Sequence, residues 1–296
     1  MYTSKQNLPH EERTASEPRG SDLHTVKIRS VKQVNQDIRV FKLGIESGPG
    51  IQFRPGQWLD VHVPSVPKAG GFTITSPPEA ALPPEDNDHA GPYLELAIQY
   101  SSENPPVDWL WQPPDILMHQ NLNVRVGGSF VWPPAEIPPE TIEGAIFVAG
   151  GVGINPLISM LTHLSISGPF PRKVHIIYST KCEPLISPPE ILFLPRLIAL
   201  ADRHPSDLYL QLHVTSIERA KSSVEKLWAC DHLRLQFGRV KRVAIANVVE
   251  GWRREEVSPK RSVGYVCGPP AMTDKMVKCL KDMGLPKERV FCEKWW

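Results

Sequence analysis

Residues 146–161 constrain the fold more than any other stretch, and they read Ile-Phe-Val-Ala-Gly-Gly-Val-Gly-Ile-Asn-Pro-Leu-Ile-Ser-Met-Leu. The apolar run from Ile146 to Ala149 is typical of a strand that is buried on both faces of a sheet. Three glycines fall within the next four positions, and the apolar residues after Pro156 have helical spacing. Proline is well accommodated in a first helical turn. The stretch therefore predicts a strand, a glycine turn and a helix.

Such a glycine turn has two interpretations. It lets a pyrophosphate approach the backbone closely at the positive end of a helix. It is equally compatible with an ordinary strand-to-helix turn whose glycines serve tight packing alone. The turn by itself leaves both interpretations open, so the rest of the chain has to decide between them.

The overall charge excludes several classes of protein. The chain has 296 residues, enough for two domains of ordinary size, and 33 basic against 32 acidic residues give a net charge of +1. This balance provides no overall field that would favour nucleic acid or an anionic membrane as a partner. No apolar run approaches the roughly 20 residues of a membrane-spanning helix, and we expect no transmembrane segment.

The cysteines and histidines predict no disulfide framework and no metal site. Five cysteines are scattered without a Cys-x-x-Cys pair, and ten histidines form no His-Glu-x-x-His motif. Cysteine use of this kind favours a reducing, intracellular compartment. We therefore expect no metal, and we expect a monomer.

The first part of the chain has the pattern of short strands without a long helix. Residues 1–22 are polar with mixed charges, which predicts a disordered segment. From residue 23 to 131, strand-like segments alternate with turns such as Pro55-Gly56. This pattern predicts a small antiparallel Greek-key β-barrel. The expected strands are 25–31, 38–43, 59–63, 70–77, 93–100 and 122–126.

The rhythm changes after the proline-rich stretch 132–140, which we interpret as the linker between two domains. Strands and helices then alternate from residue 141 to 296, which predicts a doubly wound parallel sheet. Within 217–262 the pattern is weaker and allows helices at 222–230 and 240–252. The expected strands are 145–149, 174–178, 208–214 and 262–267, and the expected helices are 155–165, 190–202 and 268–284.

Taken together, the motifs resemble those of the ferredoxin–NADP reductase superfamily. They are the Pro-Gly-Gln turn at 55–57, the aromatic-Thr segment at 72–73, the glycine turn, Cys-Gly-Pro-Pro-Ala-Met at 267–272 and Glu-Lys-Trp-Trp at 293–296. The resemblance covers about residues 25–296, and it is closer to the oxidoreductase NAD-binding domain-containing protein 1 group, because of Glu103-Asn-Pro-Pro106 and the closing Glu-Lys-Trp-Trp. It implies a flavin-type barrel followed by an NAD(P)-binding domain.

The resemblance also implies a set of cofactor-binding residues. Cys267 and Glu293 would be the catalytic residues beside the nicotinamide, although a lone cysteine there is also compatible with a small buried apolar residue. Thr is more common in the family where this chain has Val152. The residues expected to bind NAD(P) are Gly150, Gly151, Val152, Gly153, Ile154, Asn155, Pro156, Ser179, Lys181, Gly268, Pro269 and Met272.

For the flavin, the resemblance implies stacking and polar contacts from both ends of the chain. Phe72, Thr73 and Ile74 would face the flavin ring. Trp295 and Trp296 match terminal aromatics, one of which would cover the ring until nicotinamide displaces it. Alternatively, the two tryptophans only close the interface between the domains.

Both elements of the family that hold the flavin pyrophosphate are altered in this chain. The family motif Arg-x-Tyr-Ser aligns with Gly70 to Thr73, so the Arg that pairs with phosphate is replaced by Gly70. The second element aligns with Asn104-Pro-Pro-Val107, where Pro105 and Pro106 have no amide hydrogen to donate. Lys42, Arg54 and Lys68 are the cations expected to compensate.

Two functional hypotheses follow. The first is an NAD(P)H-dependent flavin oxidoreductase, in which hydride passes through FAD to an unidentified acceptor, either a small molecule or a separate redox protein. The second is a non-catalytic or regulatory NAD(P)H-binding protein that has lost its flavin site. The segment 216–221 mixes cations, which would suit the 2′-phosphate of NADPH, with Glu218, which would suit the free 2′-hydroxyl of NADH. We favour NADH by analogy with the closer group. That group also implies a mitochondrial location, with the cytoplasm as the alternative because the N-terminal residues are a poor presequence.

Overall fold

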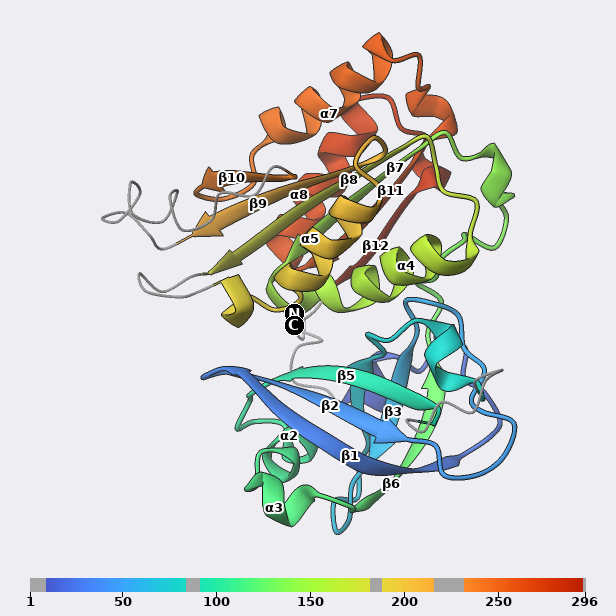
Figure 1. Ribbon diagram of the computed structural model, residues 1–296, viewed down its shortest axis with the longest axis vertical. Helices are drawn as coiled ribbons and strands as arrows, with labels where there is room; N and C mark the ends of the chain where they lie inside the picture. The colour runs from blue at the N-terminus through green and yellow to red at the C-terminus, as the bar shows by residue number, and fades with distance from the viewer. Residues whose placement is uncertain (1–8, 84–90, 182–187, 216–231, 295–296) are drawn as a thin grey trace, which may run out of the picture. The chain divides into compact units, whose positions relative to one another are not determined.

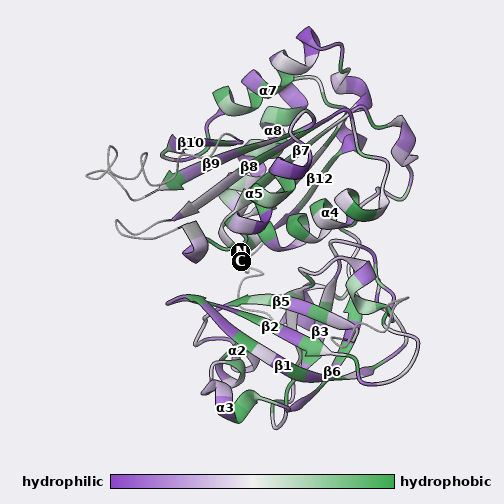
Figure 2. Cartoon of the chain, in the orientation of Figure 1, coloured by the Kyte–Doolittle hydropathy of each residue, from purple (hydrophilic) through white to green (hydrophobic). Residues whose placement is uncertain are grey.

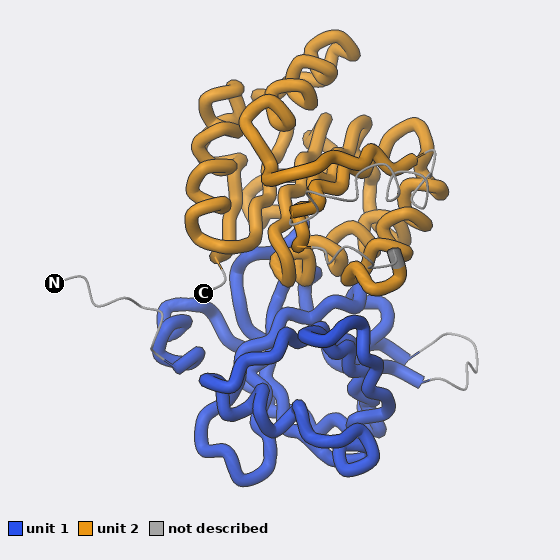
Figure 3. Tube along the Cα trace, turned by 90° about the vertical axis from the view of Figure 1, so that its left-hand side faces the viewer, with its two compact units in different colours: residues 1–132 blue, residues 133–296 orange. Residues whose placement is uncertain are grey.

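The computed structural model describes residues 9–83, 91–181, 188–215 and 232–294. It divides into two compact units, residues 1–132 (unit 1) and residues 133–296 (unit 2), as Figure 3 shows. The division falls after Trp132, at the start of the proline-rich stretch. Each unit has its own sheet and its own apolar core.

Unit 1 is an antiparallel barrel of six strands in the order β4-β3-β6-β1-β2-β5 (Figure 1). An isolated bridge between Ile74 and Leu96 joins the two edge strands, and the amide of Thr75 donates to the carbonyl of Glu95 at 2.8 Å. The strands are β1 (His24–Asn35), β2 (Ile38–Gly44), β3 (Trp58–His62), β4 (Gly70–Thr73), β5 (Tyr93–Gln99) and β6 (Asn121–Gly127).

The barrel core follows from the alternation of apolar and polar residues along its strands. Leu59 and Val61 of β3 point inward with Phe72 of β4, whereas Trp58 and Asp60 lie on the opposite face of β3. Three short helices accompany the strands: α1 (His10–Arg13), α2 (Pro105–Leu110) and α3 (Pro114–Leu117). Val107 and Leu110 of α2 belong to the same core, so this helix packs against the barrel.

The expectation that residues 1–22 are disordered is wrong for residues 9–22. Residues 1–8 lie outside the described residues. The segment 9–22 holds α1, and the amide of Gly20 donates to the carbonyl of Val126 at 2.8 Å. Arg19 forms a bridge with Gly127 of β6 and an ion pair with Asp60 of β3. The partners of this segment are distant in the sequence, so its local composition carries no sign of them.

Unit 2 is a parallel sheet of six strands in the order β10-β9-β8-β7-β11-β12. The chain starts at β7, moves outward to β10 and returns to β11 on the other side of β7, which confirms the expected doubly wound architecture. The strands are β7 (Gly144–Gly150), β8 (Lys173–Lys181), β9 (Leu208–Thr215), β10 (Leu233–Phe237), β11 (Val263–Gly268) and β12 (Val290–Lys294). The sequence prediction missed β10 and β12, and its possible helix at 222–230 lies outside the described residues.

Helices cover both faces of this sheet: α4 and α5 on one, α7 and α8 on the other (Figure 1). Figure 2 shows apolar and hydrophilic residues along each of α4 and α7, as expected for helices with one buried side. The helices are α4 (Ile154–Ser167), α5 (Leu194–Arg203), α7 (Arg242–Arg254) and α8 (Pro270–Asp282). Short 3₁₀ turns occur at Pro78–Ala81, Pro139–Thr141, Gly151–Gly153, Pro188–Glu190, Pro259–Arg261 and Lys287–Arg289.

Candidate active site

The expected NAD(P) residues of unit 2 gather where the strand order reverses. β7 and β11 are neighbours, with Cys267 paired in register with Ala149. The carboxyl end of β7 leads through the glycine turn (residues 150–153) into α4, and that of β11 leads through the Cys-Gly-Pro-Pro turn (residues 267–270) into α8. The crevice at such a reversal is where doubly wound sheets bind their ligands.

The two turns pack backbone against backbone. A Cβ on Gly153 would lie 2.3 Å from the carbonyl oxygen of Cys267 and 2.8 Å from the Cα of Gly268. A Cβ on Gly150 would lie 2.8 Å from Sδ of Met272 and 2.9 Å from Cδ of Pro269. At Gly153 the close atoms are backbone, so the contact between the two turns by itself requires glycine there, whereas at Gly150 they are side-chain atoms of Met272 and Pro269.

Gly151 has a different reason to be glycine. Its φ of +56° lies in the left-handed region, and nothing lies within 4 Å of the position a Cβ would take. Its open side is therefore accessible to a group approaching the start of α4. The first amides of a helix lack partners within the helix and carry its positive end, which suits an anion.

Several expected residues build the start of α4 rather than project from it. Ile154, Asn155 and Pro156 are buried in the first turn of this helix, and Val152 is half-buried. Because these side chains are wholly or partly buried, the backbone of the turn is the part of this segment that remains for a ligand.

Cys267 and Glu293 lie side by side on neighbouring strands. They are register partners in the β11–β12 ladder, and Cys267 is completely buried, whereas Glu293 is half-buried. On the other side of the glycine turn, Ser179 of β8 is the register partner of Gly150, and Lys181 is exposed at the end of that strand. The structure thus brings the expected residues together at the carboxyl ends of four neighbouring strands, β8, β7, β11 and β12.

Thr273 is a residue of this site that the sequence reasoning missed. Its buried hydroxyl donates to the carbonyl of Gly268 at 3.1 Å, and its amide donates to the carbonyl of Pro269 at 3.0 Å. These bonds fix the Cys-Gly-Pro-Pro turn, whose Gly268 has a φ of +155°. A hydroxyl residue just inside a helix that follows Gly-Pro-Pro was the available signal.

In unit 1 the expected flavin residues are buried. Phe72 is only 7% exposed and belongs to the barrel core, so its ring offers no open face for stacking. Ile74 is fully buried at the seam of the barrel. The hydroxyl of Thr73 is buried on the opposite side of β4 from Phe72, and it has no hydrogen-bond partner among the described residues.

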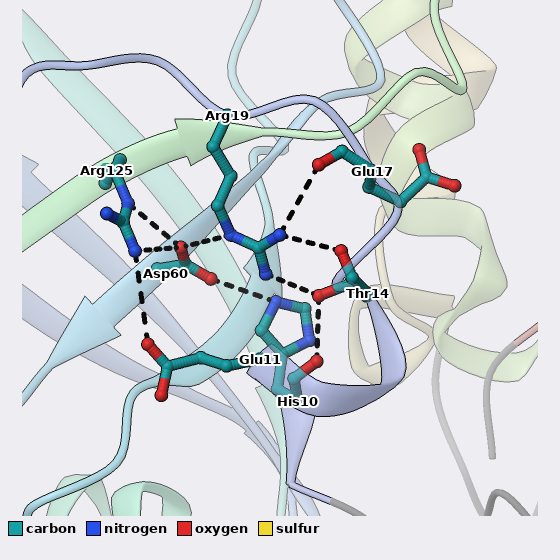
Figure 4. A network of polar contacts seen from close by, with 7 residues as sticks. All are labelled: His10, Glu11, Thr14, Glu17, Arg19, Asp60 and Arg125. Atoms are coloured by element: carbon teal, nitrogen blue, oxygen red, sulfur yellow. Dashed lines mark hydrogen bonds and ion pairs between the residues drawn. The ribbon is translucent and has the colours of Figure 1, made fainter.

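A polar network covers the outer face of β3, β4 and β6 (Figure 4). Its centre is the carboxylate of Asp60, which lies 3.2 Å from Nε2 of His10, 2.9 Å from Nε of Arg19 and 3.1 Å from a terminal nitrogen of Arg125. Burial raises the pKa of Asp60, but hydrogen bonds from His10 and Arg19 and the charge of Arg19 lower it to about 2. The imidazole of His10 occupies the space beside Gly71.

Some expected residues lie outside the described part of the chain. They are Trp295 and Trp296 and the segment 216–221 that was expected to choose between NADH and NADPH. Within the described ranges, no three His, Cys, Asp or Glu side chains are arranged to hold a metal ion. None of the described helices is long and apolar enough to cross a membrane.

Comparisons with known proteins agree with this geometry. The profile of the Oxidoreductase NAD-binding domain family matches residues 147–278, which include both turns. Oxidoreductase NAD-binding domain-containing protein 1 of Danio rerio is 31% identical over 301 residues, covering 99% of this chain and 100% of the relative. The chain belongs to the family of this relative, the oxidoreductase NAD-binding domain-containing protein 1 family. The Homo sapiens member is 30% identical and aligns over 100% of this chain and 87% of its own length.

Solved structures identify the fold. A ferredoxin NADP⁺ reductase from Neisseria gonorrhoeae, solved with bound FAD and NADP, is 17% identical with a TM-score of 0.64, covering 94% of this chain and 100% of that one.

The reductase component of propane 2-monooxygenase from Rhodococcus jostii is a more distant sequence relative, 24% identical over 91% of this chain and 62% of its own. The family is thus of the oxidoreductase type with the ferredoxin–NADP reductase fold, as the sequence predicted.

Proposed function

We propose that this chain is an NAD(P)H-dependent oxidoreductase that takes a hydride from the nicotinamide and transfers it to an acceptor not yet identified. The observation that carries the proposal is the contact between the glycine turn and the Cys-Gly-Pro-Pro turn at the strand-order reversal of unit 2. The open side of Gly151 at the start of α4 is the position for the pyrophosphate. The nicotinamide then lies beside Cys267 and Gly268.

The residues of unit 2 have distinct roles in this proposal. The backbone of the glycine turn binds phosphate, and Thr273 keeps the Cys-Gly-Pro-Pro turn in shape through Gly268. Cys267 and Glu293 flank the reacting carbon, with Trp295 and Trp296 following Glu293 in the chain. Ser179 and Lys181 reach the dinucleotide from β8. Because hydride transfer is the chemistry of the cofactor, these residues need only position the ring and exclude water.

FAD is the cofactor that the fold implies, and unit 1 fits it only in part. The partnerless buried hydroxyl of Thr73 suits a polar atom of a flavin ring. Gly70 provides no cation for the phosphates, and the space beside it is filled by Phe72 and Pro106. The residues present therefore do not fit FAD as a tightly held prosthetic group, and no step of the proposed reaction is assigned to it.

A second function is favoured by the altered phosphate position of unit 1. A chain that binds NAD(P)H in unit 2 and lacks a flavin in unit 1 would act as a non-catalytic or regulatory NAD(P)H-binding protein. The filled space beside Gly70 supports this alternative, whereas the assembled Cys267 and Glu293 pair supports the oxidoreductase.

One experiment separates the two functions. NADH binding is measured by calorimetry, and NADH oxidation is followed with ferricyanide as terminal acceptor, with and without added flavin. Steady oxidation that falls at least tenfold in Cys267→Ala, with NADH binding retained, supports the oxidoreductase. Binding without turnover supports the regulatory protein, and a chain that binds neither NADH nor NADPH contradicts both.

The nucleotide preference is a finer part of the proposal. We propose NADH over NADPH, by analogy with the closer group alone. Values of kcat/KM measured for both nucleotides under the same conditions test it, and a higher value for NADPH contradicts it.

A further inference from the structure

The first turn of α2 packs against β4 at Gly70. A Cβ on Gly70 would lie 2.8 Å from Cβ of Pro106 and 2.6 Å from Cε2 of Phe72. Both distances are far inside van der Waals contact, so no side chain fits at this position unless its neighbours move. The two places where the chain departs from the flavin motif of its superfamily, Gly70 and Pro106, are therefore in contact with each other.

The contact belongs to the core and is not a loose surface approach. Phe72 is 7% exposed, and Pro106 and Val107 are buried at the start of α2. Phe72 and Val107 are members of the same apolar cluster. Opening a space beside Gly70 would thus require part of the barrel core to move, which is costly in a close-packed interior.

The start of α2 also lacks the donors that an anion needs. Pro105 and Pro106 have no amide hydrogen, so the first two positions of this helix offer no backbone donor. The nearby cation Lys68 is paired with Glu12 at 3.0 Å. Lys42, the second expected compensating cation, lies over the ring of Tyr93 at 4.6 Å from its centroid.

We propose that the Gly70–Pro106 contact closes the phosphate position of the barrel, so that the phosphates of a flavin nucleotide add nothing to its binding by unit 1. A flavin that binds unit 1 then gains nothing from its phosphates. FAD therefore has no higher affinity than FMN or riboflavin, and FAD is not retained as a prosthetic group. The inference rests on the proposed function only in taking the barrel as the flavin-facing unit.

The test compares the three flavins on the full-length protein. The absorption spectrum of the purified chain reports any retained flavin, and fluorescence titrations give Kd for FAD, FMN and riboflavin. We expect no retained FAD and three Kd values within about threefold of one another. FAD that co-purifies stoichiometrically, or that binds at least tenfold tighter than riboflavin (about 1.4 kcal/mol), overturns the inference.

The same titration separates this inference from the proposed function. If no flavin binds at all, the closed phosphate position is supported, and any flavin-dependent form of the oxidoreductase is contradicted. If FAD binds tightly and riboflavin weakly, the inference fails, whereas a flavin-dependent oxidoreductase is supported.

A gain-of-function variant tests the cause. Gly70→Arg combined with Pro106→Gly supplies the missing cation, removes the contact with Cβ of Pro106 and restores one amide donor. The far end of the Phe72 ring, 2.6 Å from the Cβ position, has to turn aside. We expect this double variant to bind FAD at least tenfold tighter than riboflavin, because Arg pairs with phosphate through two hydrogen bonds. Pro106→Gly alone, which opens the contact but supplies no cation, is the matched control and should show a smaller preference for FAD than the double variant.

Circular dichroism and thermal unfolding show whether the double variant is folded. A folded double variant without a preference for FAD contradicts the assignment of the closure to these two residues. If the double variant does not fold, the comparison of the three flavins on the wild-type protein decides.

Discussion

At the scale of single residues, the side of Gly153 that would carry a Cβ faces the backbone of Cys267. A methyl group there would lie 2.3 Å from the carbonyl oxygen and 2.5 Å from the carbonyl carbon. Backbone atoms cannot turn aside as the end of a flexible side chain can. We therefore expect Gly153→Ala to push the two turns apart, with a loss of about 1–3 kcal/mol in stability and at least a tenfold loss in NADH affinity. Urea unfolding and calorimetry measure the two effects.

Gly251→Ala provides the matched control for this substitution. Gly251 lies in α7, has an ordinary φ, and no atom lies within 4 Å of its Cβ position. Alanine there should stabilise unit 2 by roughly 0.5–1 kcal/mol, because it has the higher helix propensity, and leave NADH binding unchanged. Equal losses of NADH affinity in the two variants would contradict the role given to Gly153.

Asp60 gives a prediction about acid stability. Its folded-state pKa of about 2 lies below the roughly 3.9 of an unfolded chain, so its ionised form stabilises the fold. That contribution, about 2 kcal/mol, is complete at neutral pH and declines as the pH falls from about 5 towards 2. We expect Asp60→Asn to be less stable at pH 7 and to differ less from the wild type at about pH 2.5, close to the folded-state pKa of Asp60. Urea unfolding at both pH values measures this, and a gap that is constant with pH contradicts it.

At the scale of elements, the barrel depends on one polar seam between β4 and β5. The hydroxyl of Thr75 donates to the buried carboxylate of Glu95 at 2.9 Å, and the amide of Glu95 donates to the hydroxyl of Ser76 at 3.1 Å. Thr75→Val keeps the shape and removes a donor to a buried charge, so we expect a loss of about 1.5–3 kcal/mol. Urea unfolding of the full-length chain provides the measurement.

Thr25→Val is the matched control for the seam. Thr25 makes a hydrogen bond of the same length, 2.9 Å, to Asn123, but this bond is exposed and joins β1 to β6 inside the sheet. Its loss should change stability by less than about 0.5 kcal/mol, because water replaces the partner. If the two substitutions lower stability by similar amounts, the hydrogen bonds of the seam contribute no more to the barrel than an exposed hydrogen bond inside the sheet.

Elements with a strong local pattern could be predicted from the sequence. The βα alternation of unit 2 and the turns at 150–153 and 267–270 follow from apolar runs, glycines and prolines that are adjacent in the chain. The helix expected at 240–252 is α7, at Arg242–Arg254. The strand β10 was missed because it is short, half-buried and paired only with β9 at the edge of the sheet.

Contacts between distant residues could not be predicted in this way. The ordered segment 9–22 depends on Asp60 and Arg125, and nothing in its own composition indicates those partners. Gly70 and Pro106 each read as a loss of phosphate-binding capacity, whereas their mutual contact is visible only in the fold. The placement of Phe72 in the core likewise depends on which face of β4 points inward, which the motif alone leaves open.

At the scale of the whole molecule, the two units have separate cores. The core of unit 1 is made of residues 26–126, and the cluster beneath α7 and α8 is made of residues 146–290. The contacts that define the dinucleotide site, between the glycine turn and the Cys-Gly-Pro-Pro turn, all lie within unit 2. Binding of the dinucleotide can therefore be measured apart from unit 1 by cutting the chain at the unit boundary.

We expect a fragment of residues 133–296 to fold by itself and to bind NADH with a Kd within about threefold of that of the full chain. Added flavin should not raise its rate of NADH oxidation with ferricyanide, because the fragment lacks the barrel that we take as the flavin-facing unit. Thermal unfolding, calorimetry and the dye assay test the three parts, with Gly153→Ala in the same fragment as the control that loses binding. A folded fragment that binds no NADH would mean that unit 1 contributes to the dinucleotide site. Oxidation at the rate of the full chain would mean that the acceptor reacts at unit 2 alone.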